Sequence, residues 1–190
     1  MRTEIVAVDS LNFTAEKDEI VLLQGENGSG KSTVLKVLAG LLKPTSGRVR
    51  VFGHDPRKKK ISIGLLPEQV QYHPGVSARN FLKLLARLDK VPLKRVDTIL
   101  KEFNLSKWAD FPPDVFSAGM KRRFGLAAAF LKDPPVLLLD EPVESLDREN
   151  KGFLLDKIKD STDKIFVVAD HGHDFEPIAT QVIKMQEGRS

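Results

Sequence analysis

The sequence of 190 residues contains no cysteine, one tryptophan and one tyrosine. The absence of cysteine excludes a disulfide scaffold, thiolate zinc sites, iron–sulfur ligation by this chain and a cysteine nucleophile. Long apolar stretches are also missing, because the longest one, at 124–131, has eight residues, whereas a membrane-spanning helix needs roughly 20. The first ten residues lack the apolar core of a signal peptide. We therefore expect a chain that does not cross a membrane by itself.

Charge of neither sign dominates, since 30 lysines and arginines oppose 26 aspartates and glutamates, for a net charge of +4. With 41% hydrophobic residues, the composition is typical of one compact domain. The positive excess lies in the segment 77–107, which carries eight basic and three acidic residues. An excess of this size is only a weak indication of a nucleic-acid partner.

Hydrophobic patterns predict strands and helices that alternate along most of the chain. Short apolar runs rich in β-branched residues predict buried strands, and apolar stripes with helical spacing predict helices. The predicted strands are 20–24, 48–52, 61–66, 136–139, 165–169 and 182–185, and the predicted helical segments are 31–41, 77–107, 119–131 and 148–159. The alternation indicates an α/β fold with a mainly parallel sheet, interrupted by a basic helical lobe.

The stretch GENGSGKS at 25–32 fits the phosphate-loop pattern and lies between a predicted strand and a predicted helix. Its glycines let successive N–H groups turn toward phosphate oxygens, and the start of the helix adds the positive end of its dipole. Lys31 should bridge the β- and γ-phosphates, Ser32 should ligate Mg²⁺, and Thr33 should contact the α-phosphate side. The predicted nucleotide-binding residues are Gly25, Glu26, Asn27, Gly28, Ser29, Gly30, Lys31, Ser32 and Thr33.

Two acidic residues, Asp140 and Glu141, follow the predicted strand 136–139. They stand at its carboxyl end, where ligands of open α/β sheets bind. Asp140 is expected to hold Mg²⁺, and Glu141 is expected to polarise the water that attacks a γ-phosphate. Together with the phosphate loop, the pair predicts hydrolysis of a nucleoside triphosphate.

Five motifs follow one another along the chain. They are GENGSGKS at 25–32, FSAGM at 116–120, VLLLDEP at 136–142, ESLD at 144–147 and a histidine after a β-rich run. In order and spacing they resemble the ATP-binding cassette (ABC) ATPases, over nearly the whole chain. The resemblance implies a P-loop NTPase fold with a mainly parallel sheet, an N-terminal antiparallel β region and an inserted helical subdomain.

By this resemblance FSAGM is the signature motif, in which Ser117 and Gly119 contact the γ-phosphate held by a partner subunit. Ser117 can also cap the following helix, whose first N–H groups form an anion site. Lys121, Arg122 and Arg123 are expected at this helix start because phosphate lies nearby. The motif departs from the common Leu-Ser-Gly-Gly-Gln, and its Gly-Met pair resembles short bacterial export-type cassettes.

Two family positions have two candidates each. Glu68 matches the glutamine that reaches the metal in the family, and Gln69 follows directly. His171 and His173 are the candidates for the switch histidine that senses γ-phosphate, and we favour His171 because its spacing to the final strand is closer to the family pattern. The predicted catalytic residues are Glu141, His171 and Lys31, and the predicted metal ligands are Ser32, Glu68 and Asp140.

Three further positions bear on the resemblance. Asp147 matches the aspartate that contacts both nucleotide sites in the family. Asp170 replaces a small serine or threonine. The sequence has no tyrosine, tryptophan or phenylalanine upstream of about residue 5 to stack on adenine. We therefore expect adenine to be held weakly or by a partner chain.

The resemblance implies one ABC ATPase domain over 1–190, with a nucleotide-binding core at 1–72 and 133–190 and a helical subdomain at 73–132. It implies ATP and Mg²⁺ as cofactors, and a second cassette and a separate membrane permease as partners. No nucleic-acid partner is expected, and the location is the cytoplasmic face of the cell membrane. The alternatives are a soluble ABC-type ATPase acting on nucleic acid or ribosomes and a low-turnover nucleotide-binding regulatory subunit.

Overall fold

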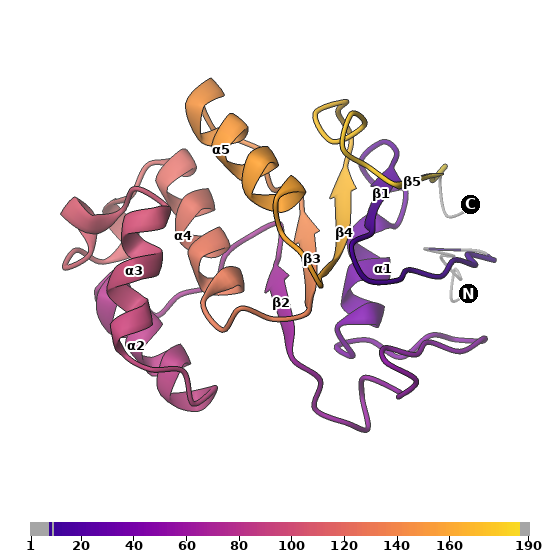
Figure 1. Ribbon diagram of the computed structural model, residues 1–190, viewed down its shortest axis with the longest axis horizontal. Helices are drawn as coiled ribbons and strands as arrows, with labels where there is room; N and C mark the ends of the chain where they lie inside the picture. The colour runs from indigo at the N-terminus through magenta and orange to yellow at the C-terminus, as the bar shows by residue number, and fades with distance from the viewer. Residues whose placement is uncertain (1–7, 9, 187–190) are drawn as a thin grey trace, which may run out of the picture.

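The computed structural model describes residue 8 and residues 10–186, which form an α/β fold. Five parallel strands lie side by side in the order β2-β3-β4-β1-β5 (Figure 1). Their bounds are β1 Ile20–Gln24, β2 Ile63–Leu66, β3 Val136–Asp140, β4 Ile165–Asp170 and β5 Gln181–Lys184. The mainly parallel sheet predicted from the alternation is confirmed.

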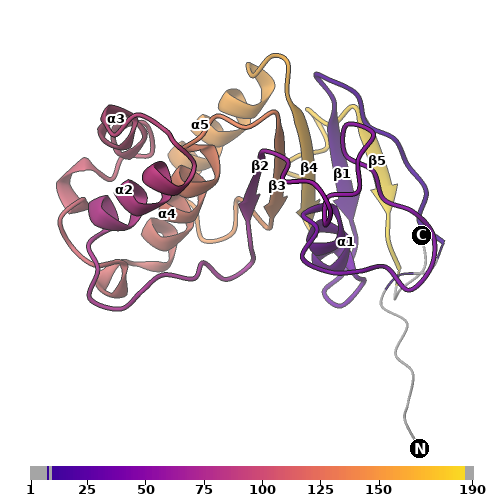
Figure 2. The ribbon, with the colours of Figure 1, turned by 90° about the horizontal axis from the view of Figure 1, so that it is seen from below.

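Both faces of the sheet are covered by helices, which explains why its central strands are almost wholly apolar. Because successive side chains point to opposite faces, the strand residues divide between two clusters. Val21 and Leu23 pack with helix α1 (Lys31–Leu38), whereas Leu22 packs with α4 (Ala118–Phe130) and α5 (Arg148–Lys159). In Figure 2, α1 lies on one side of the strands and α5 on the other.

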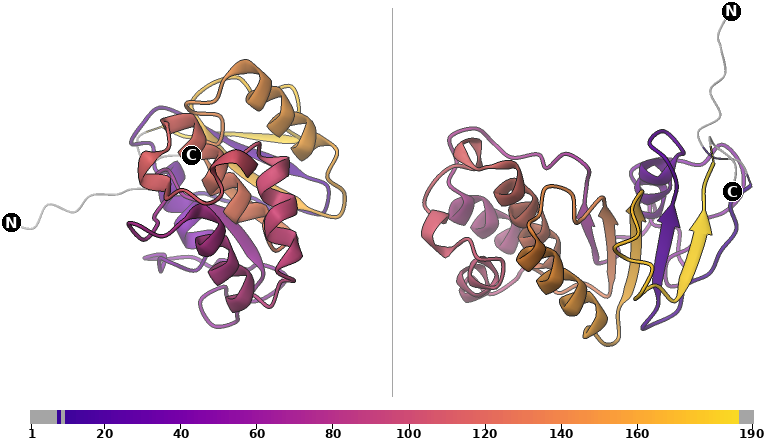
Figure 3. Two further views of the ribbon diagram at one scale, coloured as in Figure 1. Left: turned by 90° about the vertical axis from the view of Figure 1, so that its left-hand side faces the viewer. Right: turned by 90° about the horizontal axis from the view of Figure 1, so that it is seen from above.

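The remaining helices gather at the end of the molecule next to β2 (Figure 3). They are α2 (Ala78–Leu88) and α3 (Lys94–Glu102), followed by the 3₁₀ turns Ser106–Trp108 and Pro113–Val115. The helical segment predicted at 77–107 is divided between α2 and α3. Lys90 adopts a left-handed φ of 58°, and Pro92 lacks the N–H that a continuing helix would need. α2, α3 and α4 contact one another and share one apolar core.

The strand predicted at 48–52 is wrong. Of these residues, Val51 forms an isolated antiparallel bridge with His54, and the backbone reverses between them through Phe52 and Gly53, whose φ angles are 49° and 76°. Among the pairings in which both partners are described residues, this bridge is the antiparallel one. An antiparallel region formed by residues 1–7 and 9 would lie outside the described residues. Within residues 8 and 10–186, every helix is too short or too polar to cross a bilayer.

Candidate functional site

The candidate site lies where three neighbouring strands end. Strands β1, β4 and β3 finish with Gln24, Asp170 and Asp140 after runs of apolar residues. The register aligns Gln24 with Asp170 and Asp140 with Ala169, so these ends lie side by side. The segments that follow the three strands therefore share one edge of the sheet, the edge at which parallel α/β sheets bind ligands.

The loop 25–30 connects β1 to α1 through backbone conformations that favour glycine. Gly28 and Gly30 have φ angles of 86° and 93°. A side chain at Gly25 would lie 2.2 Å from the carbonyl oxygen of Met185, so the loop packs closely on the chain after β5. Gly30 caps α1 without a side chain, which leaves the first amides of the helix available to an anion.

Lys31 folds back over this loop. Its Nζ donates hydrogen bonds to the carbonyl oxygens of Gly25, at 2.6 Å, and Glu26, at 3.0 Å. The side chain is 5% exposed. Nearby, the buried hydroxyl of Ser29 has no hydrogen-bond partner among the described residues. An ammonium group and an unpartnered hydroxyl beside the first amides of α1 fit a phosphate ligand.

Ser32, Glu68 and Asp140 meet beside the loop. Burial raises the pKa of Asp140, the negative charge of Glu68 raises it further, and a hydrogen bond with Ser32 opposes these effects. The carboxylate is 4% exposed, and its Oδ1 has no hydrogen-bond partner in the described part of the chain. Carboxylate and hydroxyl oxygens are the ligands that Mg²⁺ prefers. The residues present therefore fit a Mg²⁺ ion. Glu68, one of the two candidates for the third ligand, is near enough for its charge to raise the pKa of Asp140.

Glu141 lies at the centre of the site in a left-handed conformation with φ 47°. One carboxylate oxygen, Oε2, is 2.7 Å from Nδ1 of His171, and the other, Oε1, is 3.7 Å from Nζ of Lys31. Burial and a hydrogen bond with the Asp170 carboxyl raise the pKa of Glu141 to about 7, against the opposing effect of His171. A carboxyl with a pKa near neutrality beside an imidazole is suited to receive a proton from water.

The two histidines after β4 have different surroundings. His171 lies against Glu141, whereas His173 points its Nδ1 to Glu176 at 2.8 Å and has a side chain that is 83% exposed. Glu176 raises the pKa of His173 and also accepts a hydrogen bond from Gln24. The geometry thus places His171, and not His173, next to the acidic group.

The residues of the signature motif lie at the start of α4. Ser117 caps the helix, because its hydroxyl accepts a hydrogen bond from the amide of Met120 at 3.3 Å. A side chain at Gly119 would lie 2.6 Å from the carbonyl oxygen of Ser145. No hydrogen bond or ion pair described in residues 10–186 joins Ser117 or Gly119 to the loop 25–30. Asp147, the other expected inter-subunit residue, caps α5 and accepts a hydrogen bond from the Asn150 amide at 2.8 Å.

Arg122 and Arg123, two of the three cations at the start of α4, both contact oxygen atoms of this chain. Arg122 is 6% exposed and donates hydrogen bonds to the carbonyl oxygens of Pro67 and Asp140 and to the carboxylate of Glu144. Arg123 donates to carbonyl oxygens at the end of α3. Arg122 therefore links the start of the Glu68 loop to the end of β3. The sequence signals it only as one of three consecutive cations.

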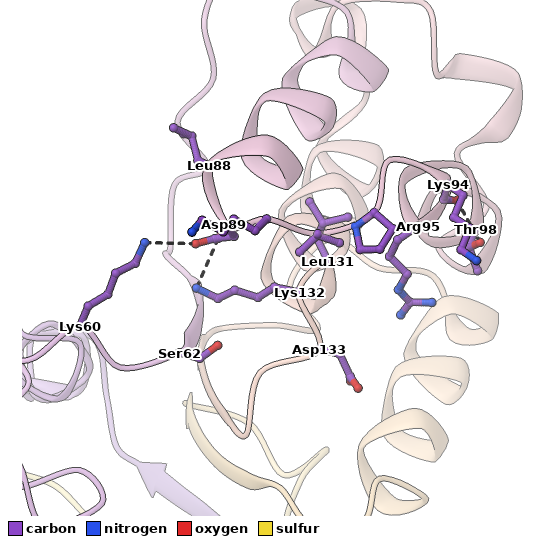
Figure 4. Close-up of a pocket in the computed structure, with 13 residues that line it drawn as sticks. Lys60, Ser62, Leu88, Asp89, Lys94, Arg95, Thr98, Leu131, Lys132 and Asp133 are labelled. Atoms are coloured by element: carbon purple, nitrogen blue, oxygen red, sulfur yellow. Dashed lines mark hydrogen bonds and ion pairs between the residues drawn. The ribbon is translucent and has the colours of Figure 1, made fainter.

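A large open cavity of about 1140 Å³ lies at the opposite edge of the sheet (Figure 4). Its lining includes Ser62 and Asp133, which precede strands β2 and β3, and the α2–α3 connection. Lys60 and Lys132 converge there on Asp89, with ion-pair distances of 3.6 and 3.5 Å. The cavity is therefore distinct from the site at the carboxyl ends of the strands.

Comparison with known proteins assigns a family to this geometry. Residues 8–144 match the ABC transporter family model. The chain is 35% identical over 188 residues to the uncharacterized ABC transporter ATP-binding protein YxlF of Bacillus subtilis, covering 96% of this chain and 63% of the relative. It is 32% identical to ABC transporter A family member 1 of Dictyostelium discoideum, of which it spans 22%. The chain thus spans less than two thirds of these two relatives.

A solved structure resembles the whole chain. The post-hydrolysis dimer of the ATP-binding cassette MJ0796, bound to ADP and Pi, has a TM-score of 0.88 and 26% sequence identity, and the match covers all of this chain and 90% of that one. The family model matches well over half of the present sequence, and the fold extends the likeness to its end. The chain therefore belongs to the ABC transporter family and has the fold of its ATP-binding cassette.

Proposed function

We propose that this chain binds and hydrolyses ATP as the cassette of an ABC transporter and that its closure with a second cassette drives a membrane permease. The observation that carries this proposal is the meeting of the loop 25–30, Asp140, Glu141 and His171 at one edge of the sheet. Phosphate-binding amides, metal-binding oxygens and a proton acceptor all lie there, which is the set of groups that phosphoryl transfer to water requires.

Binding of the triphosphate begins at the loop 25–30. Its amides and the start of α1 receive the phosphates, and the ammonium of Lys31 exchanges its carbonyl partners for phosphate oxygens. Ser32, Asp140 and Glu68 would hold Mg²⁺, and the ion would supply positive charge against the phosphates. Lys31 adds a positive charge beside the leaving diphosphate.

Hydrolysis uses Glu141 as the acceptor for the proton of the attacking water. The water oxygen bonds to the γ-phosphorus while the bond to the β-phosphate oxygen breaks, and the products are ADP and phosphate. His171 orients the Glu141 carboxylate through its 2.7 Å contact and offers its other ring nitrogen to the γ-phosphate. Because its pKa is raised, Glu141 is protonated in part of the molecules near neutral pH, and it must release this proton before it can act as a base.

A second cassette completes each site. The hydroxyl of Ser117 and the start of α4 lie on an exposed surface and form an anion site that a phosphate of another chain can reach. The cassette compared above forms a dimer with ADP and Pi, which supports two-chain closure here. Either two copies of this chain or this chain and a homologue fit the proposal.

We infer that the contact with a permease lies on α2. Leu84 and Leu88, one helical turn apart, are 52% and 65% exposed, and Lys83 and Arg87 lie beside them. Named relatives include the bacitracin transport ATP-binding protein BcrA of Bacillus licheniformis, which supports a transport role. The cassette would then lie at the cytoplasmic face of the membrane through its permease.

The decisive experiment compares the wild type with Glu141→Gln in single-turnover hydrolysis of ATP. Nucleotide binding should persist, while hydrolysis should fall by roughly 10²–10⁴-fold because the proton acceptor is lost. Equal rates would contradict the catalytic proposal. They would favour a second candidate function, a low-turnover regulatory subunit. The carboxyl pair of Glu141 and Asp170 supports that candidate, because it keeps Glu141 partly protonated and so less able to accept a proton.

A further inference from the structure

Three side chains beside β3 and β4 form a compact set of potential metal ligands. Glu141, Asp170 and His171 each provide one ligand atom, and these atoms lie within 4.8 Å of one another. The set shares no residue with the proposed Mg²⁺ ligands Ser32 and Asp140. It contains an imidazole, whereas the Mg²⁺ ligands are all oxygen atoms.

Asp170 supplies a second and independent observation. Its side chain is 2% exposed, and its Oδ2 has no hydrogen-bond partner among residues 10–186. The carboxyl also makes a hydrogen bond with Glu141. A buried oxygen of a carboxylate without a partner is costly, because it has lost its hydration. The proposed hydrolysis assigns no task to this residue, so its unpartnered oxygen remains to be explained.

The charges around the cluster leave room for a cation. Glu141 and Asp170 place two acidic groups together, and Lys31 lies 3.7 Å from the Oε1 atom of Glu141. The ammonium of Lys31 is occupied by the carbonyl oxygens of Gly25 and Glu26. Two buried carboxylates are stabilised either by a shared proton or by a metal ion that replaces it.

We propose that Glu141, Asp170 and His171 bind a divalent transition-metal ion such as Zn²⁺ in the nucleotide-free cassette, and that the bound ion blocks hydrolysis. An imidazole with two carboxylates suits Zn²⁺ better than Mg²⁺. The ion would take the place of the hydrogen bond between His171 and Glu141. It would thereby occupy both residues of the proposed hydrolytic pair.

The local structure supports such a site. Ligand atoms at about 2.1 Å from Zn²⁺ lie about 3.4 Å apart in a tetrahedron. The three ligand atoms lie within 4.8 Å of one another, and His171 Nδ1 is already 2.7 Å from Glu141 Oε2, so the side chains need only small shifts to reach this spacing. The following loop is held to β1, because Nε2 of Gln24 donates to the carbonyl oxygen of Gly172 at 3.1 Å. The His171 side chain is 57% exposed, which gives the ion and a water ligand access from solvent.

The test measures Zn²⁺ binding to the nucleotide-free chain by calorimetry in excess Mg²⁺, and the visible absorption of bound Co²⁺. The wild type should bind one ion per chain. Asp170→Ser and His171→Ala should each weaken binding at least about tenfold, because each loses a direct ligand. Matched controls are His173→Ala and Asp174→Ser, which remove the same side chains two and four residues further along the chain, outside the cluster. Both controls should bind as the wild type does.

Asp170→Ser is expected to fold, because it removes a buried carboxyl and leaves a small polar side chain. The proposal would be overturned if Asp170→Ser bound Zn²⁺ as tightly as the wild type does. It would also be overturned if His173→Ala lost as much Zn²⁺ affinity as His171→Ala. In ATPase assays Zn²⁺ should inhibit the wild type and inhibit Asp170→Ser at least about tenfold more weakly. The binding measurement needs no ATP, so its outcome is distinguishable from failure of the proposed ATPase function.

Discussion

Glu141 combines three features at one residue that bear on stability as well as on catalysis. Its carboxyl is buried, hydrogen-bonded by a second carboxyl, and held in a left-handed backbone conformation. Burial and Asp170 both disfavour the charged form, and His171 favours it. The folded chain therefore retains the proton of Glu141 over a pH range in which the unfolded chain has lost it.

This difference predicts a pH-dependent effect of Glu141→Gln on the free energy of unfolding. Between the ordinary pKa of 4.5 and the raised pKa of about 7, the folded state binds more protons than the unfolded state, so wild-type stability falls as pH rises. Glutamine cannot ionise, so the free energy of unfolding of the variant should rise relative to that of the wild type by about 2–3 kcal/mol between pH 4.5 and pH 8. Urea unfolding at several pH values measures the difference. A constant difference across this range would contradict the raised pKa.

Side-chain direction is the part of the site that the sequence left open. Lys121, Arg122 and Arg123 are consecutive, and a helix turns about 100° per residue, so they cannot share one direction. Only the fold shows that Arg122 is turned inward, onto the carbonyl oxygens of Pro67 and Asp140. The residue types and spacing of the loop 25–32 predict its ligand better than those of the three cations do. In this loop the backbone conformation, more than the direction of side chains, determines what can bind.

At the scale of secondary structure, the buried strands were predictable and the exposed one was not. Strands at 20–24, 136–139 and 165–169 are apolar because helices cover both faces, and the structure confirms them to within one residue. Among the described residues, the alternation at 48–52 has no neighbouring strand to pair with, and a local pattern cannot reveal whether a partner exists. The surroundings of the two histidines likewise depend on where β4 ends. The strand ends at Asp170, so His171 follows it directly and contacts Glu141, whereas His173 contacts Glu176.

Two helical glycines predict opposite effects of the same substitution to alanine. At Gly152 in α5, nothing lies within 4 Å of an added side chain, so alanine should stabilise the chain by about 0.5–1 kcal/mol through its better helix propensity. At Gly119 in α4, the added carbon would lie 2.6 Å from the carbonyl oxygen of Ser145. Gly119→Ala should therefore destabilise the chain by about 1–3 kcal/mol. Denaturant unfolding tests both, and a stabilised Gly119→Ala would contradict the close packing of α4 on the segment after β3.

At the scale of the whole molecule, the groups that the proposed hydrolysis uses lie on two separate surfaces. The loop 25–30, Asp140 and Glu141 meet at one sheet edge, whereas Ser117 lies exposed at the start of α4. In the proposed head-to-tail dimer, each site takes the first surface from one chain and the second from its partner. Lys31 and Glu141 then belong to the same half of a site, and Ser117 belongs to the other half.

This division predicts that two inactive variants restore activity when they are mixed. Lys31→Ala removes the phosphate ligand of its own site, and Ser117→Asp keeps a helix cap but places a negative charge where the partner's phosphate should lie. Random pairing of equal amounts would give one intact site in half of the dimers, or up to about a quarter of wild-type activity per chain. Mixing Lys31→Ala with Glu141→Gln is the matched control, because every pairing then leaves both sites damaged. Steady-state ATPase assays above the dimerisation concentration measure both mixtures, and equal activity in the two would contradict the head-to-tail arrangement.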